Sequence, residues 1–183
     1  MNPKLQLLSQ MYNDSNGKLK QDLLFKACFI KDLKDAISML SHKQQVYFAL
    51  QCSESVKHMI NDYEETLIEA QKCLDLVKIW LKNDKAASST EQKLRNAANA
   101  VWSDAWSATY AAASAVDAAW SAAYTAYAAD AANNSAKAAY HHHNKSEQAK
   151  QKQEQLNLSF LIDAINYKGQ QNESQASIAF TNV

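Results

Sequence analysis

Apolar side chains recur every three or four residues along most of the chain, and this spacing predicts amphipathic α-helices. In the leucine-rich first part, the predicted helices span residues 3–12, 18–40, 42–60 and 63–82. The second of these has a wide apolar face that includes Leu23 and Phe29. Ser41 and Asp62 are predicted to cap the third and fourth, because short oxygen-bearing side chains accept hydrogen bonds from first-turn N–H groups.

A second pattern begins after a polar linker at residues 83–90. Between residues 100 and 132, alanine is interspersed with tryptophan, tyrosine, serine and aspartate, and glycine, proline and basic residues are absent. At about 100° per residue, the large aromatic side chains fall on one stripe of a helix and many alanines on the opposite side. The stripe comprises Trp102, Trp106, Tyr110, Trp120, Tyr124 and Tyr127.

This alanine-rich pattern predicts the inner helical segment of a tight bundle. Alanine has the highest helix propensity and lets helices approach closely, while aromatic rings supply the buried area that alanine lacks. One long helix and a reversal near residues 114–117 are both compatible with the segment. A break is predicted at Asn133–Asn134–Ser135, and a further apolar helix is predicted over residues 156–167.

The fold class follows from the residues that are missing. Glycine and proline are absent between residues 18 and 168, whereas sheet proteins rely on them for tight turns. We therefore expect an all-α, compact multi-helix bundle that forms one domain over residues 1–168. Its leucine-rich half spans residues 3–83, its alanine/aromatic half spans 88–168, and residues 169–183 are expected to form a flexible tail.

Composition and charge narrow the class of protein. The chain has 183 residues and a formal net charge of zero, without the basic excess that is typical of nucleic-acid-binding proteins. It has neither a membrane-spanning apolar run nor a signal peptide after Met1, so we expect a cytoplasmic protein without membrane or nucleic-acid partners. Its three cysteines lack paired spacing and are interpreted as small buried apolar residues.

The sequence contains no motif that indicates catalysis. Phosphate-binding loops, dinucleotide fingerprints, zinc-protease motifs and nucleophile elbows are all absent, so no catalytic, cofactor-binding or metal-ligating residue is predicted. His141, His142 and His143 are adjacent, but consecutive helical side chains point about 100° apart and cannot chelate one ion together. A solvated patch is the favoured interpretation, and a partner contact or a pH-sensitive role stays open.

The order of several segments is similar to that of a known family. These segments are YFALQCSESVKHMI (47–60), AQKCLDLVKIWLKN (70–83), the alanine-rich run and SAKAAYHH (135–142). Over roughly residues 40–142 the chain resembles the alanine-rich, Imm-five-like immunity proteins of bacterial toxin–immunity systems. The resemblance implies a non-enzymatic cytosolic inhibitor that binds a cognate toxin and occludes its active site or substrate surface. It transfers no site residue, because the matching positions are packing positions.

We therefore expect a protein that binds and neutralises a cognate bacterial toxin. The alternative is a phage- or pathogen-encoded inhibitor or effector that binds a host protein, and a homodimer is compatible with either. Trp102, Trp106 and Tyr110 are the candidate partner-binding residues, because exposed aromatics are typical hot spots; the competing interpretation is that they pack in the core. An enzyme of unfamiliar type and an ice-binding helix are further classes, although the alanine-rich run has too few threonines for an ice-binding face.

Overall fold

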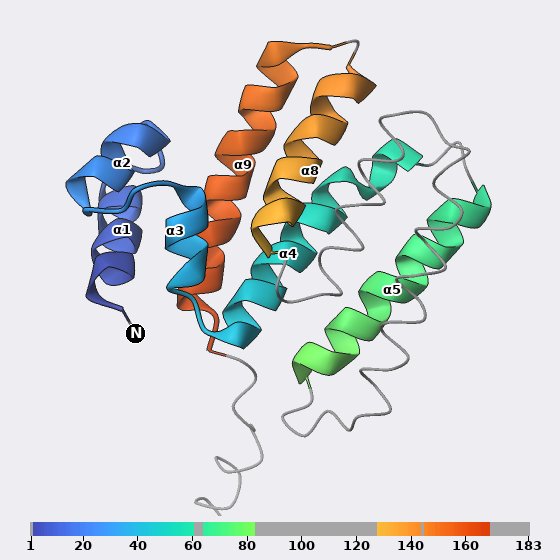
Figure 1. The fold of residues 1–183 in the computed structure, drawn as a ribbon, viewed down its shortest axis with the longest axis horizontal. Helices are drawn as coiled ribbons and strands as arrows, with labels where there is room; N and C mark the ends of the chain where they lie inside the picture. Colours follow the sequence, from blue (N-terminus) through green and yellow to red (C-terminus); the bar gives the residue numbers. More distant parts are fainter. Residues whose placement is uncertain (1, 61–63, 83–127, 144, 169–183) are drawn as a thin grey trace, which may run out of the picture.

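The computed structural model of the chain describes residues 2–60, 64–82, 128–143 and 145–168 (Figure 1). Every regular element in these ranges is a helix and none is a strand, which confirms the predicted all-α fold class. The elements are α1 (Pro3–Asp14), α2 (Gln21–Ala27), α3 (Leu33–Ser38), α4 (His42–Val56), the 3-10 helix η1 (Lys57–Ile60), α5 (Glu64–Lys82), α8 (Ala128–His142) and α9 (Glu147–Asn166).

Helix α4 lies at the centre of the described part of the molecule. It packs against α5 on one side and against both α8 and α9 on the other (Figure 1). Helices α8 and α9 run antiparallel through a short turn and pack against each other. Helices α1, α2 and α3 form a corner beside them, in which α1 contacts α9 and α3 contacts α8.

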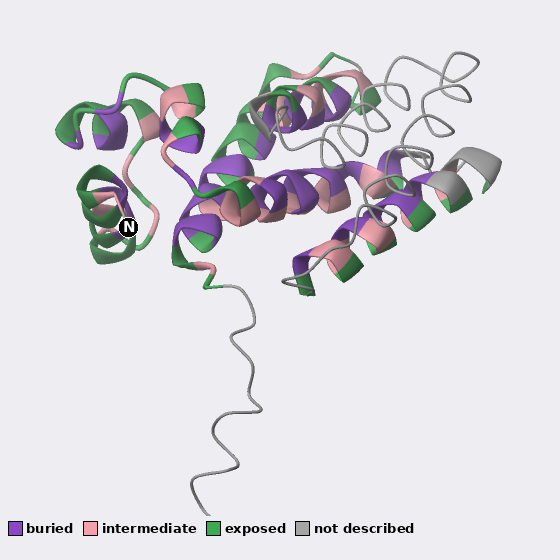
Figure 2. Cartoon of the chain, turned by 60° about the horizontal axis from the view of Figure 1, so that its bottom comes forward, coloured by how far each residue is buried: buried purple, intermediate pink, exposed green. Residues whose placement is uncertain are grey.

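The start of α4 is determined by its local sequence. The Ser41 hydroxyl accepts from the Gln44 backbone N–H at 3.4 Å, and the Gln44 side chain accepts from the Ser41 N–H at 2.9 Å. This reciprocal capping box confirms Ser41 as the predicted cap. Beyond it, one side of the helix is buried along its length (Figure 2). Among the described residues, Phe48 is the largest side chain that is fully enclosed.

Helix α8 contributes small side chains to the core. Its buried apolar residues are Ala131, Ala132, Ala136, Ala138 and Ala139. Each alanine buries little area, so its main effect is to let the backbones of α4 and α9 lie close to α8. Of the alanine-rich segment at residues 100–132, the structure describes residues 128–132, where Ala131 and Ala132 are buried; the aromatic stripe lies outside the described residues.

A buried polar network joins α4, α8 and α9. Asn157, which is 1% exposed, lies at the centre of this network. Its side-chain NH₂ group donates to the Ala132 carbonyl at 3.0 Å and to the Ser135 hydroxyl at 3.1 Å. The Asn157 amide oxygen accepts from Gln153 at 3.0 Å, and Gln153 also donates to the Ser55 hydroxyl at 2.8 Å. Because an unpartnered polar group would be costly here, the network favours one register of the three helices.

Contacts at the C-terminal end of α9 fix it to two distant parts of the chain. Gln44 donates to the Ile165 carbonyl at 2.9 Å, and the Tyr47 and Tyr167 rings stack with their centroids 4.3 Å apart. Asn166 donates to the Ser9 hydroxyl of α1 at 3.1 Å. The last described helix is thus held against both α4 and the first helix.

An ion network joins α4 to α5. The Lys78 ammonium lies 2.6 Å from one carboxylate oxygen of Glu54, and Lys57 donates to the other at 3.0 Å. Lys57 also donates to Gln71 of α5 at 2.6 Å. Burial alone would raise the pKa of Glu54, but hydrogen bonds and charge from the two lysines outweigh it, and this pKa lies below its usual value.

The prediction of one helix over residues 18–40 is wrong, because two short helices occupy this range. Helix α2 ends at Ala27, and α3 begins at Leu33. The Asp32 carboxylate caps α3 by accepting from the Asp35 N–H at 2.8 Å. Apolar spacing did not reveal the break, since two successive helices can carry buried residues at the same intervals as one.

Two further boundaries differ from the prediction. Helix α8 continues through Asn133–Asn134–Ser135, because the Ser135 hydroxyl bonds the Ala132 carbonyl within the helix at 2.9 Å instead of capping a new one. Helix α9 begins at Glu147, well before residue 156, and Ser146 caps it by accepting from the Ala149 N–H at 3.3 Å. The polar stretch before residue 156 is therefore the first half of α9.

Candidate protein-binding surface

The aromatic residues that the sequence suggested for partner binding, Trp102, Trp106 and Tyr110, lie outside the described residues. The Asp62 cap, the boundary of the alanine/aromatic half and the tail at 169–183 also lie outside them. Within the described ranges, a different aromatic residue is exposed, at the end of α2.

Helix α2 ends in a Schellman motif whose left-handed residue is Phe29. The Ile30 N–H donates to the Phe25 carbonyl at 2.9 Å, and the Phe29 N–H donates to the Lys26 carbonyl at 3.2 Å. Phe29 has a φ angle of 55°, which glycine adopts readily and which costs other residues about 1–2 kcal/mol. Phe25 and Ile30 are both buried in the core, as is common on either side of such a motif.

The Phe29 side chain is exposed to solvent on this disfavoured backbone. It is 81% exposed, and Leu23 on the same helix is 56% exposed. Single exposed apolar residues are ordinary, but here two occur on one short helix and its terminal turn. The backbone beneath the ring is tied to α1, because the Lys4 ammonium donates to the Phe29 carbonyl at 2.7 Å. The ring is therefore presented from a fixed position.

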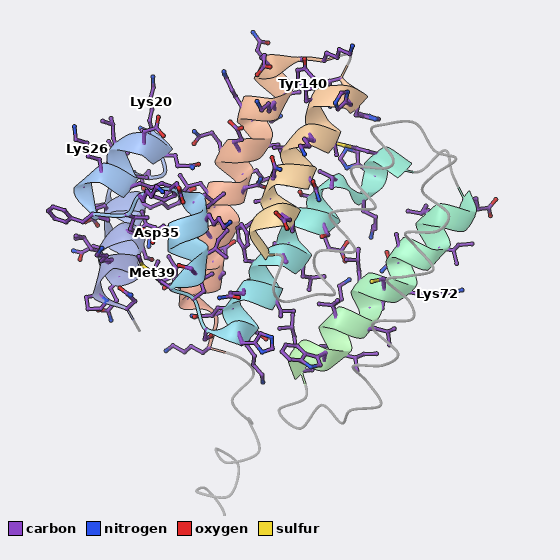
Figure 3. All side chains as sticks on the ribbon, in the orientation of Figure 1. Lys20, Lys26, Asp35, Met39, Lys72 and Tyr140 are labelled. Atoms are coloured by element: carbon purple, nitrogen blue, oxygen red, sulfur yellow. The ribbon has the colours of Figure 1, made fainter. Side chains whose placement is uncertain are left out.

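Basic side chains surround these apolar groups. Residues 18–34 include five lysines and two aspartates, a formal charge of +3, whereas the whole chain has no net charge. These lysines are exposed, and none of the ion pairs between described residues involves them. Lys20 and Lys26 point away from the bundle (Figure 3). We call Leu23, Phe29, Lys20, Lys26 and Lys31 the Phe29 corner.

A groove of about 970 Å³ lies between the α2–α3 region and the pair α8–α9. It is open to solvent and mostly polar. Its amide side chains that are not fully buried are Gln21, Asn133, Gln148, Gln151 and Gln155. Its charged residues are Lys20, Lys34, Lys152, Asp22, Asp32, Asp130 and Glu154. Lys20 belongs to both the groove and the Phe29 corner, so the two surfaces are continuous.

The histidines at the end of α8 form a surface patch. His142 and His143 are exposed, and the His142 ring lies 6.0 Å from the His58 ring, centroid to centroid, in an edge-on arrangement. Among the described residues, no group of three potential ligands converges as a metal site would need. The two exposed rings agree with the solvated patch that the sequence favoured.

The three cysteine side chains are buried, and none of them forms a disulfide. Burial raises the pKa of Cys73 to about 12, and it also raises the pKa values of Cys28 and Cys52. The thiolate is the reactive form, so these side chains are poor nucleophiles and metal ligands. They pack as small apolar groups, which is the role that the sequence indicated.

Sequence reasoning missed Phe29 as a surface residue, because it placed Phe29 on the apolar face of a long helix. One local signal for the break is the spacing Asp32–x–x–Asp35. An aspartate three residues before an acidic residue is typical of a helix start and would have assigned Phe29 to the preceding turn.

Comparison with protein-family models, with curated proteins and with solved structures finds no match for the chain. Of the helices described, none is both long enough and apolar enough to cross a bilayer.

Proposed function

We propose that the chain is a protein-binding inhibitor that covers a surface of its partner and performs no reaction on it. The observation that carries this proposal is Phe29, an aromatic side chain 81% exposed on a left-handed backbone. Residues in disfavoured conformations cluster at functional sites, where the surrounding structure compensates for their strain. An aromatic anchor of this kind suits the centre of a protein interface.

The fixed turn supports the role of an anchor. The two Schellman hydrogen bonds and the bond from Lys4 hold the backbone of Phe29 before any partner arrives. A side chain presented from a fixed backbone loses less conformational entropy on binding than one on a mobile loop. Insertion of the ring into a partner's apolar pocket would remove from water the surface that is now exposed.

The charge around Phe29 indicates the partner's chemistry. Exposed lysines beside an apolar anchor are complementary to a pocket with acidic side chains at its rim, and such charges speed association. The sequence resemblance favours a bacterial toxin as the protein that carries this pocket. We therefore propose toxin neutralisation, with the Phe29 corner at the contact.

Co-expression with candidate toxins tests this function. Cells that express a toxin encoded beside this gene should grow when the wild-type chain is present, and the two proteins should co-elute in gel filtration. Phe29→Ala should weaken the complex at least about thirtyfold, the loss expected of a hot spot worth 2 kcal/mol or more. The variant should remain folded, because the ring packs on little of the core.

Ile79→Ala is the matched control, since Ile79 is 48% exposed but lies on α5. It should leave both growth and complex formation unchanged. Absence of rescue and of a complex with every neighbouring toxin would contradict the proposal. So would tight binding of a single-stranded oligonucleotide that depends on Phe29, because stacking on a base is the other use of an aromatic ring among lysines.

A further inference from the structure

We infer that the groove beside the Phe29 corner binds an extended stretch of polypeptide through its main chain. The groove lies between α2–α3 and α8–α9 and has a volume of about 970 Å³. This inference rests on the proposed function, because the bound stretch would be a segment of the same partner. It adds a second contact that differs in chemistry from the insertion of Phe29.

The amide side chains of the groove are available to a ligand. Those of Gln21, Asn133, Gln148, Gln151 and Gln155 make no hydrogen bond to any other described residue. Each can donate two hydrogen bonds and accept through its oxygen. Asn157 also lines the groove, but its amide is fully used in the buried network. Asn157 is therefore held in place by the protein, while the other five amides remain able to form hydrogen bonds with a ligand.

The mixture of donors and acceptors matches the peptide group. An extended chain presents N–H and C=O groups about every 3.3 Å, and side-chain amides can pair with both. In other complexes with extended peptides, main-chain hydrogen bonds give affinity and side-chain pockets give specificity. A site that bonds the main chain alone would bind peptides with little regard to their side chains. The volume lies near the upper end of the roughly 300–1,000 Å³ of ligand sites, which is sufficient for a short peptide.

The other residues of the groove disfavour two competing ligands, a nucleic acid and a sugar. Three lysines are balanced by four carboxylates, so the described lining has no cationic excess to attract a phosphate-rich polymer. No aromatic ring occurs among the described lining residues, and the apolar face of a sugar ring would find only Leu33, Ala132 and Ala136. A neutral, extended peptide fits this lining better than either.

Peptide binding to the full chain tests the inference. A neutral, extended peptide of about twelve residues, with serine and valine in alternation, is synthesised with a fluorescent label. Its affinity is measured by fluorescence anisotropy. Gln148→Ala with Gln151→Ala should weaken binding about tenfold, since each lost hydrogen bond contributes about 0.5–1.5 kcal/mol. Both glutamines are exposed on α9, so circular dichroism should show an unchanged fold.

Gln6→Ala with Gln10→Ala is the matched control, because these glutamines are exposed on α1 and do not line the groove. This variant should bind the peptide like the wild type. A second readout separates main-chain from side-chain recognition. Methylation of alternate backbone nitrogens of the peptide should weaken binding about tenfold, because it removes donors. Replacement of single peptide side chains by alanine should change affinity much less.

Several results would overturn the inference: no binding of the neutral peptide, binding unaffected by the groove glutamines, tolerance of backbone methylation, or displacement of the peptide by maltotriose. The outcome is distinct from that for the proposed function. If Gln148→Ala with Gln151→Ala neutralises the toxin as well as the wild type while Phe29→Ala does not, the groove inference fails and the proposed function survives. If the groove binds peptide but no toxin is neutralised, the proposed function fails.

Discussion

The centre of the bundle and the corner formed by α1–α3 use phenylalanine in opposite ways. In α4, Phe48 is fully buried within regular helix. In the corner, Phe29 is 81% exposed on a left-handed backbone. Burial of the first ring contributes about 1.5–3 kcal/mol to folding, whereas the second adds strain and little burial. The buried ring stabilises the centre of the bundle, and we propose that the exposed ring contacts a partner.

Amide side chains repeat the same contrast. In the centre, the hydrogen-bonding groups of Asn157 are satisfied by partners on the same helix and on α8, and Gln153 adds a link to α4. In the groove, Gln148, Gln151 and Gln155 lie on the same helix α9 and make no hydrogen bond to another described residue. One helix thus presents amides that specify packing on one side and amides that a ligand can use on the other.

The largest effect is expected for Phe48→Ala. Removal of a fully buried ring from α4 should lower the free energy of unfolding by about 3–5 kcal/mol, since the cavity is only partly filled by relaxation. Phe29→Ala should change it by less than about 0.5 kcal/mol, as is usual for surface positions. Urea titrations followed by circular dichroism measure both. If Phe48→Ala and Phe29→Ala lowered the free energy of unfolding equally, the two rings would contribute equally to stability, contrary to this prediction.

The next largest effect is expected for Asn157→Ala, which should lower the free energy of unfolding by about 2–3 kcal/mol. The substitution leaves the Ala132 carbonyl, Ser135 and Gln153 without their shared partner in the interior. Asn133→Ala, on the exposed face of α8, is the control and should be within about 0.5 kcal/mol of wild type. Thermal unfolding of the two variants gives the comparison. A wild-type melting curve for Asn157→Ala would show that the network does not hold the three helices together.

Phe29→Gly sharpens the contrast in the other direction. Glycine relieves the left-handed strain, so the variant should be more stable than wild type by about 1 kcal/mol. It should nevertheless lose partner binding, because the anchoring ring is gone. Chemical denaturation and the co-expression assay read the two effects separately. A destabilised Phe29→Gly variant would show that the ring contributes to the fold after all.

The smallest effect concerns the ion network between α4 and α5. Glu54→Gln should lower the free energy of unfolding by about 0.5–1 kcal/mol at neutral pH, because the pair is partly exposed. The folded-state pKa of Glu54 is depressed, so its stabilisation is present above the unfolded value of about 4.3 and is lost as pH falls through the folded value. The difference in the free energy of unfolding between wild type and Glu54→Gln should therefore become smaller in acid.

Glu147→Gln is the control for this prediction. Glu147 pairs with Lys150 at 3.7 Å, but its side chain is 65% exposed. Unfolding of this variant should match that of wild type at both neutral and acidic pH. If the difference in the free energy of unfolding between wild type and Glu54→Gln became larger in acid, the pKa of Glu54 would not be lowered in the folded protein.

Local signals explain the boundaries that were predicted correctly. Ser41 caps α4 through Gln44, which is three residues away, and Pro3 begins α1 where a helix needs no N–H donor. Where the prediction was wrong, a tertiary contact overrode the local signal. Asn133–Asn134–Ser135 has the composition of a turn, but Ser135 is buried against Asn157 of α9 and the helix continues.

The sequence by itself determined the all-α class and the start of α4 at the Ser41 cap, because helix formation and capping depend on groups within about one helical turn of each other. Only the tertiary structure decided which phenylalanine is buried and which amides are satisfied. The partner of Gln153 on α4 is 98 residues away, and that of Asn157 on α8 is 25 residues away. Residue type states only that an amide needs hydrogen bonds; packing decides whether the chain or a ligand supplies them.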